Sequence, residues 1–180
     1  MWSGGSSLRG HYNERVLALR YVYVLALAVW LGGMAVLGAV VAPATFQVLQ
    51  ATEPASGRLL AGAVFGAVLL RFHYVAYASG ALLLVTLAAM ALLGPRPRGF
   101  AARSAIIAVM LGVALYSGYV VLPEVDSIQH AVGALPSSLP AEDARRIRFD
   151  ALHQLSTRLM MLNIAGTLAL LFWEAREHER

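Results

Sequence analysis

Residues 155–173 read LSTRLMMLNIAGTLALLFW, and Arg158 is the one charged residue in this stretch. A helix needs about 20 largely apolar residues to cross the hydrocarbon core of a bilayer. Three further stretches meet or approach this length: Tyr21–Thr45, Phe72–Leu93 and Ser104–Leu122. Because backbone groups in lipid must bond within their own segment, we expect all four stretches to be helices. The sequence therefore predicts an all-α fold, an integral membrane four-helix bundle.

The composition supports a membrane location. The 180 residues are 59% hydrophobic and 13% charged, and the mean hydropathy is +0.66, which is too apolar for a soluble domain of this size. The net charge of +4 does not indicate nucleic-acid binding, since the sequence shows no basic groove with interleaved aromatic residues. The expected partner is the lipid bilayer. The absence of cysteine excludes disulfides, thiolate metal sites and cysteine nucleophiles.

The arginines predict the topology. They cluster before the first span, between the second and third spans, and after the fourth: Arg9, Arg15, Arg20, Arg96, Arg98, Arg103, Arg176 and Arg180. Because cytoplasmic loops collect basic residues, we expect both termini and the Gly94–Arg103 loop to be cytoplasmic. The predicted parts are a cytoplasmic segment 1–20, a four-span membrane domain 21–173 and a cytoplasmic tail 174–180. All basic residues being arginine is typical of a GC-rich bacterial genome, so we expect the bacterial inner membrane.

Two helices are predicted to extend beyond the bilayer on the non-cytoplasmic side. A helix opened by Pro54 would run into the second span, and its Arg58–Leu93 part would be about 50 Å long, against roughly 30 Å of hydrocarbon. A helix opened by Ser138 or Pro140 would feed the fourth span, with Pro123–Ser137 as the main extramembrane loop. Small residues four apart, Ala28/Gly32 and Ala108/Gly112, predict close helix contacts. The sequence shows no repeat of 20–50 residues.

The same topology predicts a binding site. The second and fourth spans both enter from the non-cytoplasmic side, which places Arg71, His73, His153 and Arg158 near one membrane face. Paired imidazoles suit haem iron, and imidazole with thioether suits copper. We therefore expect His73 and His153 to bind haem b or copper, with Met160 as a third metal ligand. Arg71 and Arg158 would hold a charged group such as a haem propionate or a lipid phosphate.

Each of these residues also has a structural interpretation. A histidine near a helix end often bonds a loop carbonyl, and methionines fill gaps in cores. Arg158 would either extend outward to the interface or pair with an acidic side chain, for which the candidates are Glu124, Asp126 and Asp150. The helical stripe of His153, Ser156, Met160, Asn163 and Thr167 is explained by hydrogen bonds between helices or by a transport path.

The sequence leaves three functions open. The first is the cofactor-binding membrane protein described above. The alternatives are an accessory or structural subunit of a larger membrane complex, or a homo-oligomer, without its own cofactor, and a small-solute transporter. Catalysis is not favoured, because no nucleophile elbow and no phosphate-binding glycine loop is present.

Several motifs resemble a known family. These are Trp30-Leu31-Gly32-Gly33-Met34, Ala42-Pro43-Ala44-Thr45-Phe46, Gly57-Arg58 through Gly62 and Phe65, Leu122-Pro123, and Phe149-x-x-Leu152-His153-x-x-Ser156. Together they resemble the transmembrane protein 205-like family over about Trp30 to Trp173, which implies a four-span bundle and no assigned chemistry. The first span is also similar to the copper-resistance protein D family, and the overall plan is similar to the membrane-bound, haem-carrying protoporphyrinogen oxidase. The histidine placement differs from both, so neither role transfers residue by residue.

Overall fold

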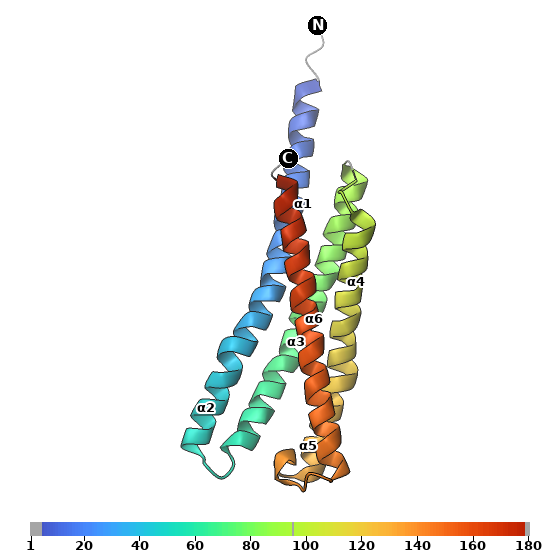
Figure 1. Ribbon diagram of the computed structural model, residues 1–180. Helices are drawn as coiled ribbons and strands as arrows, with labels where there is room; N and C mark the ends of the chain where they lie inside the picture. Colours follow the sequence, from blue (N-terminus) through green and yellow to red (C-terminus); the bar gives the residue numbers. More distant parts are fainter. Residues whose placement is uncertain (1–4, 95, 179–180) are drawn as a thin grey trace.

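The computed structural model describes residues 5–94 and 96–178, and every regular element in this part of the chain is helical. In chain order these elements are α1 (Gly5–Val36), η1 (Leu37–Val41), α2 (Ala42–Thr52), α3 (Gly57–Leu93), α4 (Phe100–Tyr116), η2 (Ser117–Val121), α5 (Leu122–Val132), η3 (Pro136–Ser138) and α6 (Ala144–His178). Figure 1 shows an elongated bundle. One end, here called the terminal end, carries both chain ends and the connection 94–99. The opposite end, here called the hairpin end, carries the connections 53–56 and 133–143.

Four helical segments are long and apolar enough to cross a membrane, which confirms the predicted multi-pass membrane protein. They are Glu14–Thr52, Gly57–Leu93, Phe100–Val132 and Ala144–Glu177. Each contains one of the stretches expected from the sequence and continues beyond it at one or both ends. At 1.5 Å per residue, the 37 residues of α3 give a helix about 55 Å long.

The four long helices form a ring in which the second and fourth spans are not neighbours. The first-span helix α1 packs on α3 and α6, and α4 also packs on α3 and α6. The helices α3 and α6 are therefore each flanked by α1 and α4 and face each other across the bundle (Figure 1).

Two π-helical turns, η1 and η2, come directly before prolines. Pro43 and Pro123 lie at the starts of α2 and α5, one residue after each π turn ends. A proline inside a helix has no N–H and clashes with the carbonyl four residues earlier. The wider turn accommodates this, since the N–H of Ala42 bonds the carbonyl of Leu37 five residues back, and Leu122 does the same with Ser117. The helix axis therefore continues through both prolines.

The two π turns also mark an internal repeat of the structure with an offset of 80 residues. Residues 37–41 and 117–121 are both π-helical, and 42–52 and 122–132 are both α-helical. The buried positions Leu27 and Trp30 recur as Ile107 and Met110. We call residues 5–93 the first half and residues 100–178 the second half. The offset is longer than the periods of 20–50 residues that the sequence was expected to lack.

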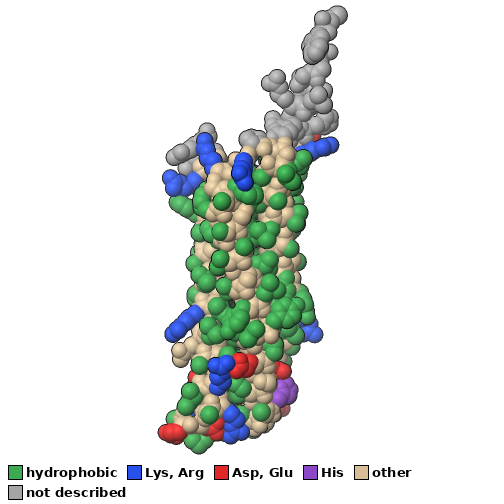
Figure 2. Space-filling model, turned by 90° about the vertical axis from the view of Figure 1, so that its right-hand side faces the viewer, with side chains coloured by type: hydrophobic (Ala, Val, Ile, Leu, Met, Phe, Trp, Pro, Cys, Tyr) green, Lys and Arg blue, Asp and Glu red, His purple; other side chains and the backbone are tan. Residues whose placement is uncertain are grey.

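Charged residues are confined to the two ends of the bundle (Figure 2). Between the charges nearest to each end, the segments 72–93, 104–123 and 159–173 contain no Asp, Glu or Arg. We call this middle region the apolar belt. The 20 residues of 104–123 extend over about 30 Å, which is the thickness of a hydrocarbon core.

The interior of the belt is held by close packing between helices. The fully buried side chains are Tyr23, Leu27, Trp30, Leu83, Leu87, Arg103, Ile107, Met110, Val121, Thr167 and Leu170. Trp30 packs directly on Gly80, where a Cβ atom would lie 3.1 Å from the indole Cζ3 and 2.9 Å from Leu111 Cδ1. In a membrane such contacts hold helices together, because lipid tails are as apolar as the side chains that they would replace.

The small residues four apart do not pack inside the bundle, so that prediction is wrong. Ala28, Gly32, Ala108 and Gly112 are all exposed, and a Cβ atom at Gly32 or Gly112 would meet nothing within 4 Å. The interior positions one turn away belong to larger residues such as Trp30 and Met110. The small residues of α1 and α4 thus form outward-facing strips.

The hairpin end differs from the prediction in its helix boundaries. The helix α3 begins at Gly57 rather than Pro54, because the chain turns so tightly that a Cβ atom at Gly57 would lie 2.0 Å from the carbonyl oxygen of Leu49. The stretch expected as the main loop contains helix α5, which ends at Gly133 with a positive φ of 62°. It pairs with α6 through Arg148, whose guanidinium donates to both carboxylate oxygens of Glu124 at 2.6 and 3.0 Å.

The helix α6 begins after an acidic residue that caps its first turn. The carboxylate of Asp143 accepts hydrogen bonds from the side chain of Arg145 at 2.8 Å and from its backbone N–H at 2.8 Å. The hydrogen bonds from the Arg145 side chain, followed by that from its backbone, lower the pKa of Asp143 to about 2.

Candidate functional site

His73 is buried on α3, at the contact between α3 and η2. With the proton assigned to Nδ1, the ring donates a 2.8 Å hydrogen bond to the carbonyl oxygen of Leu69 on the same helix. Gly118 of η2 lies against the ring, since a Cβ atom there would be 2.8 Å from His73 Cδ2 and 2.0 Å from the Tyr77 hydroxyl. This bond leaves Nε2 as the ring nitrogen that could bind a ligand.

His153 lies in different surroundings. It is exposed on α6, and its ring stacks on Phe149 with centroids 6.4 Å apart and planes at 9°. Because α3 and α6 face each other across the bundle, a bond from both histidines to one ligand would have to form between non-neighbouring helices. Among the described residues, no group of three His, Asp or Glu side chains is placed to hold a metal ion.

The remaining residues of the α6 stripe reach into the bundle at different depths. Met160 is half-buried against the hydrophobic core, and its Cε lies 3.9 Å from the position of a Cβ at Gly38. Asn163 and Thr167 are buried, and the Thr167 hydroxyl donates a 2.6 Å bond to the carbonyl of Asn163. The side-chain oxygen of Asn163 has no partner among the described residues. The stripe is therefore a line of interior positions, with His153 outside it.

Arg71 and Arg158 are both exposed, and within the described chain neither is paired with a carboxylate. Arg71 donates a 3.2 Å bond to the carbonyl of Ala67 on its own helix. Glu124, one of the expected partners of Arg158, is paired with Arg148 instead. The two arginines thus lie at the border of the apolar belt nearest to the hairpin end, where exposed guanidinium groups suit a membrane interface.

Two cavities open on the bundle surface. One, of about 450 Å³, lies along α1 and α3 and is lined almost wholly by apolar groups. The other, of about 460 Å³, lies beside Trp173 at the terminal end. Neither cavity is lined by His73, His153 or Met160.

A cluster of four charged side chains lies inside the terminal end, and we call it the charge cluster. It consists of Arg20 of α1, Arg103 of α4, and Glu174 and Glu177 of α6. Glu174 accepts bonds from both Arg20 and Arg103, while Glu177 accepts from Arg103 at 3.2 Å and lies 3.5 Å from Arg20. The side chain of Arg103 is 1% exposed, and its guanidinium carbon lies 4.8 Å above the ring of Tyr23.

The charge cluster joins three of the four spans. Two positive and two negative groups balance, so the interior carries no net charge at this point. A buried ion pair costs desolvation energy when it forms, but removing one partner leaves an uncompensated charge and costs about 3–5 kcal/mol. The arrangement therefore fixes the relative positions of α1, α4 and α6 at the terminal end.

The sequence analysis did not single out the charge cluster, although a signal was present. Arg20, Arg103 and Glu174 each lie at the end of a span that borders the same membrane face in the predicted topology. The arginines were interpreted as topology signals alone, and the acidic residues after the fourth span were not considered. Opposite charges at one membrane level of adjacent helices would have predicted the pairs.

The comparisons with known proteins identify a family but no biochemical role. Residues 25–133 match a family described as "Domain of unknown function (DUF4149)". The matched region contains the Trp30–Met34, Ala42–Phe46 and Leu122-Pro123 motifs and ends before the segment that carries His153. No curated protein and no solved structure matches the chain. Because the match covers more than half of its length, the chain belongs to the family of the domain of unknown function DUF4149.

Proposed function

We propose that this protein is an accessory subunit of a larger membrane assembly in the bacterial inner membrane, with both termini in the cytoplasm. Eight of the arginines lie in the sequence near the terminal end and six near the hairpin end, and this bias supports a cytoplasmic terminal end. The helix lengths beyond the apolar belt support an extension of α3 and α6 on the non-cytoplasmic side. The shared motifs support kinship with the transmembrane protein 205-like family.

The observation that carries this proposal is the placement of the small residues. Membrane helices associate where small side chains let their backbones approach closely. Ala28 and Gly32 on α1, and Ala108 and Gly112 on α4, present such strips to the outside, where no helix of this chain covers them. Two outward strips on equivalent helices of the two halves suit a subunit that contacts neighbouring helices on two sides.

Mild extraction followed by native mass spectrometry tests this proposal. We expect the wild-type protein to migrate above its single-chain mass of 19.3 kDa, with a second copy or with other membrane chains. Gly32→Leu combined with Gly112→Leu should release the single chain, because leucine keeps the helices apart. Ala88→Leu, the same kind of enlargement at an exposed α3 position outside the strips, should not. A wild-type protein that stays a single chain under every mild condition would contradict the proposal.

A second candidate is a haem or copper site at His73, as one observation favours it. The bond from Nδ1 to the Leu69 carbonyl orients the ring and leaves Nε2 as a ligand nitrogen, an arrangement that metal-binding histidines commonly use. His153 and Met160 of α6 would complete the site only if α6 supplies ligands across the bundle. Arg71 and Arg158 would then bind a charged group of the cofactor at the same level.

Visible spectroscopy and metal analysis of the purified protein test the second candidate. The proposal expects stoichiometric iron or copper that is lost in His73→Ala and in His153→Ala. His130→Ala, which changes an exposed histidine of α5, is the matched control and should keep the metal. Pure protein with neither iron nor copper after growth in supplemented medium would exclude the site.

A further inference from the structure

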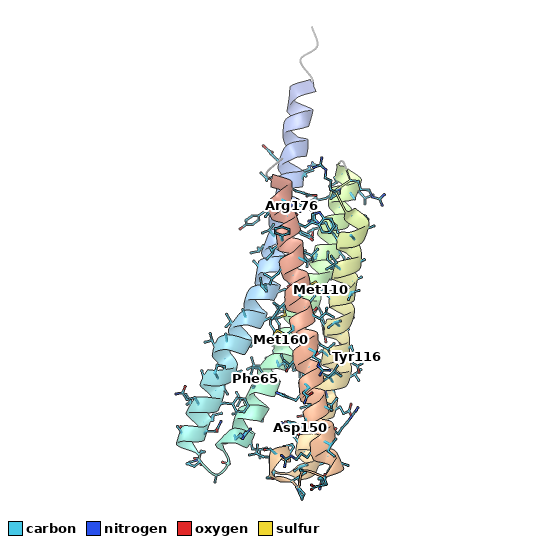
Figure 3. All side chains as sticks on the ribbon, in the orientation of Figure 1. Phe65, Met110, Tyr116, Asp150, Met160 and Arg176 are labelled. Carbon is cyan, nitrogen blue, oxygen red and sulfur yellow. The ribbon has the colours of Figure 1, made fainter. Side chains whose placement is uncertain are left out.

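The cavity at the terminal end lies across the border of the apolar belt. It has a volume of about 460 Å³ and is lined by Arg98, Ala169, Phe172, Trp173, Arg176 and Glu177. Ala169, Phe172 and Trp173 belong to the belt, whereas Arg98 and Arg176 lie beyond it. Figure 3 shows Arg176 on α6 near the end that carries the chain termini. One wall is thus apolar and the other is charged.

The charged wall carries a net positive charge. The carboxylate of Glu177 is already bound by Arg103 and faces Arg20 within the charge cluster. In the described chain, neither Arg98 nor Arg176 is paired with a carboxylate. Arg176 lies over the ring of Phe172, with its guanidinium carbon 5.6 Å from the centroid, so its hydrogen-bond donors remain available.

The backbone next to Arg98 is fixed against the apolar wall. Gly99 has a φ of 65°, and a Cβ atom at this position would lie 2.1 Å from Trp173 Cζ2. Only glycine allows this conformation and this close approach without strain. The connection that carries Arg98 is therefore held on the indole of Trp173, at a fixed distance from α6.

We propose that this cavity binds an anionic phospholipid, whose phosphate bonds Arg98 and Arg176 and whose acyl chain lies on Ala169 and Phe172. A phosphate accepts several charge-assisted hydrogen bonds from guanidinium groups. Phe172 is 65% exposed and offers apolar contact on the belt side of the phosphate. The change from charged to apolar lining matches the order of groups in a phospholipid, which neither free phosphate nor an acidic peptide would satisfy on both walls.

Native mass spectrometry of the full chain in phosphatidylcholine nanodiscs that contain increasing phosphatidylglycerol tests this site. We expect the wild-type protein to retain phosphatidylglycerol in preference to phosphatidylcholine. Arg98→Gln combined with Arg176→Gln should weaken this retention about 30-fold, since each arginine near a membrane surface contributes roughly tenfold or slightly less. Arg98→Lys combined with Arg176→Lys should keep most of the preference, because lysine also binds phosphate as a point charge.

The controls separate this site from general attraction of anionic lipid. Arg15→Gln combined with Arg96→Gln removes the same charge from exposed positions of the same end and should leave retention within about twofold. Millimolar inorganic phosphate should not displace the lipid. Complete displacement by phosphate would instead assign a free-phosphate site and overturn the proposal. Equal loss in the two glutamine double variants, or no preference in the wild type, would also overturn it.

Discussion

The two halves of the bundle share one plan and differ in what they bury. Each half runs through a helix, a π turn, a proline-started helix and a return helix, 80 residues apart. The first half buries Tyr23, Leu83 and Leu87, and at the corresponding positions the second half buries Arg103, Asn163 and Thr167. The plan thus depends on apolar length and on the proline turns, whereas the polar groups inside the second half serve contacts between the halves.

The histidines show the same contrast. His73 and His153 are also 80 residues apart, yet His73 is buried beside η2 and His153 is exposed. Equal positions in a repeat do not give equal surroundings, because α3 is covered by the π turn of the second half. A functional role for either histidine must therefore be tested one residue at a time.

The largest effect is expected from removing the acidic residue at the centre of the charge cluster. Glu174→Ala leaves Arg103 buried without its main partner and should lower the free energy of unfolding by about 3–5 kcal/mol. Unfolding in mixed detergent micelles measures it. The double variant Arg103→Met with Glu174→Leu should recover most of the loss, because both buried charges are gone and Arg20 keeps Glu177. A double variant as unstable as Glu174→Ala would show that charge compensation is not the cause.

Exchanging the buried residues at position 80-fold equivalents sharpens the comparison further. Leu83→Asn buries an unpaired amide in the first half and should cost about 2–3 kcal/mol of unfolding free energy. The reverse change, Asn163→Leu, removes an amide whose oxygen has no described partner and should be neutral within about 1 kcal/mol. The same unfolding assay compares the two. A loss above 3 kcal/mol for Asn163→Leu would reveal a partner essential to the interior.

The glycines of the two π turns form a matched pair. Gly118→Ala would place a methyl group 2.0 Å from the Tyr77 hydroxyl, whereas Gly38→Ala would meet its nearest neighbour, Met160 Cε, at 3.9 Å. We expect Gly118→Ala to destabilise the protein by about 1–3 kcal/mol through overpacking. Gly38→Ala should change stability by less than half as much. Equal melting temperatures for the two variants would contradict the described contact between α3 and η2.

The smallest effect concerns the start of α6, which is capped by a carboxylate. The pKa of Asp143 is about 2 in the folded protein, below its ordinary value of 3.8. A lowered pKa means that the cap stabilises the first turn fully above pH 4 and loses this contribution as the pH falls through about 2. A carbon-13 NMR titration of the carboxyl group should give a midpoint near 2. Arg145→Gln, which removes the main donor, should move the midpoint toward 3.8.

Most of the fold could be predicted from the sequence, because the apolar stretches report the bilayer directly. All four expected spans lie within the helices observed, and the arginine pattern correctly placed both termini and the 94–103 connection at one end. The errors occurred where local signals have two outcomes. Pro123 was expected to precede a loop, but η2 lets the helix continue through it as α5. Small residues four apart predict a close contact without stating whether the partner helix is internal.

The site could be predicted less well, since ring positions of helices decide which side chains meet. His73, His153, Arg71, Arg158 and Met160 were expected at one membrane level, and membrane level alone does not determine which helices are neighbours. The charge cluster was within reach of the sequence, since Arg103 and Glu174 border the same membrane face. Only the packing of α4 on α6 shows that they form a pair.

The sequence by itself determined that this chain crosses a membrane four times as helices, because a backbone in lipid has no other way to satisfy its hydrogen bonds. The tertiary structure decided which faces of those helices meet. Packing among apolar helices in an apolar solvent depends on shape and on a few polar pairs rather than on hydrophobicity. The outward strips, the buried charge cluster and the different surroundings of the two histidines follow from that shape.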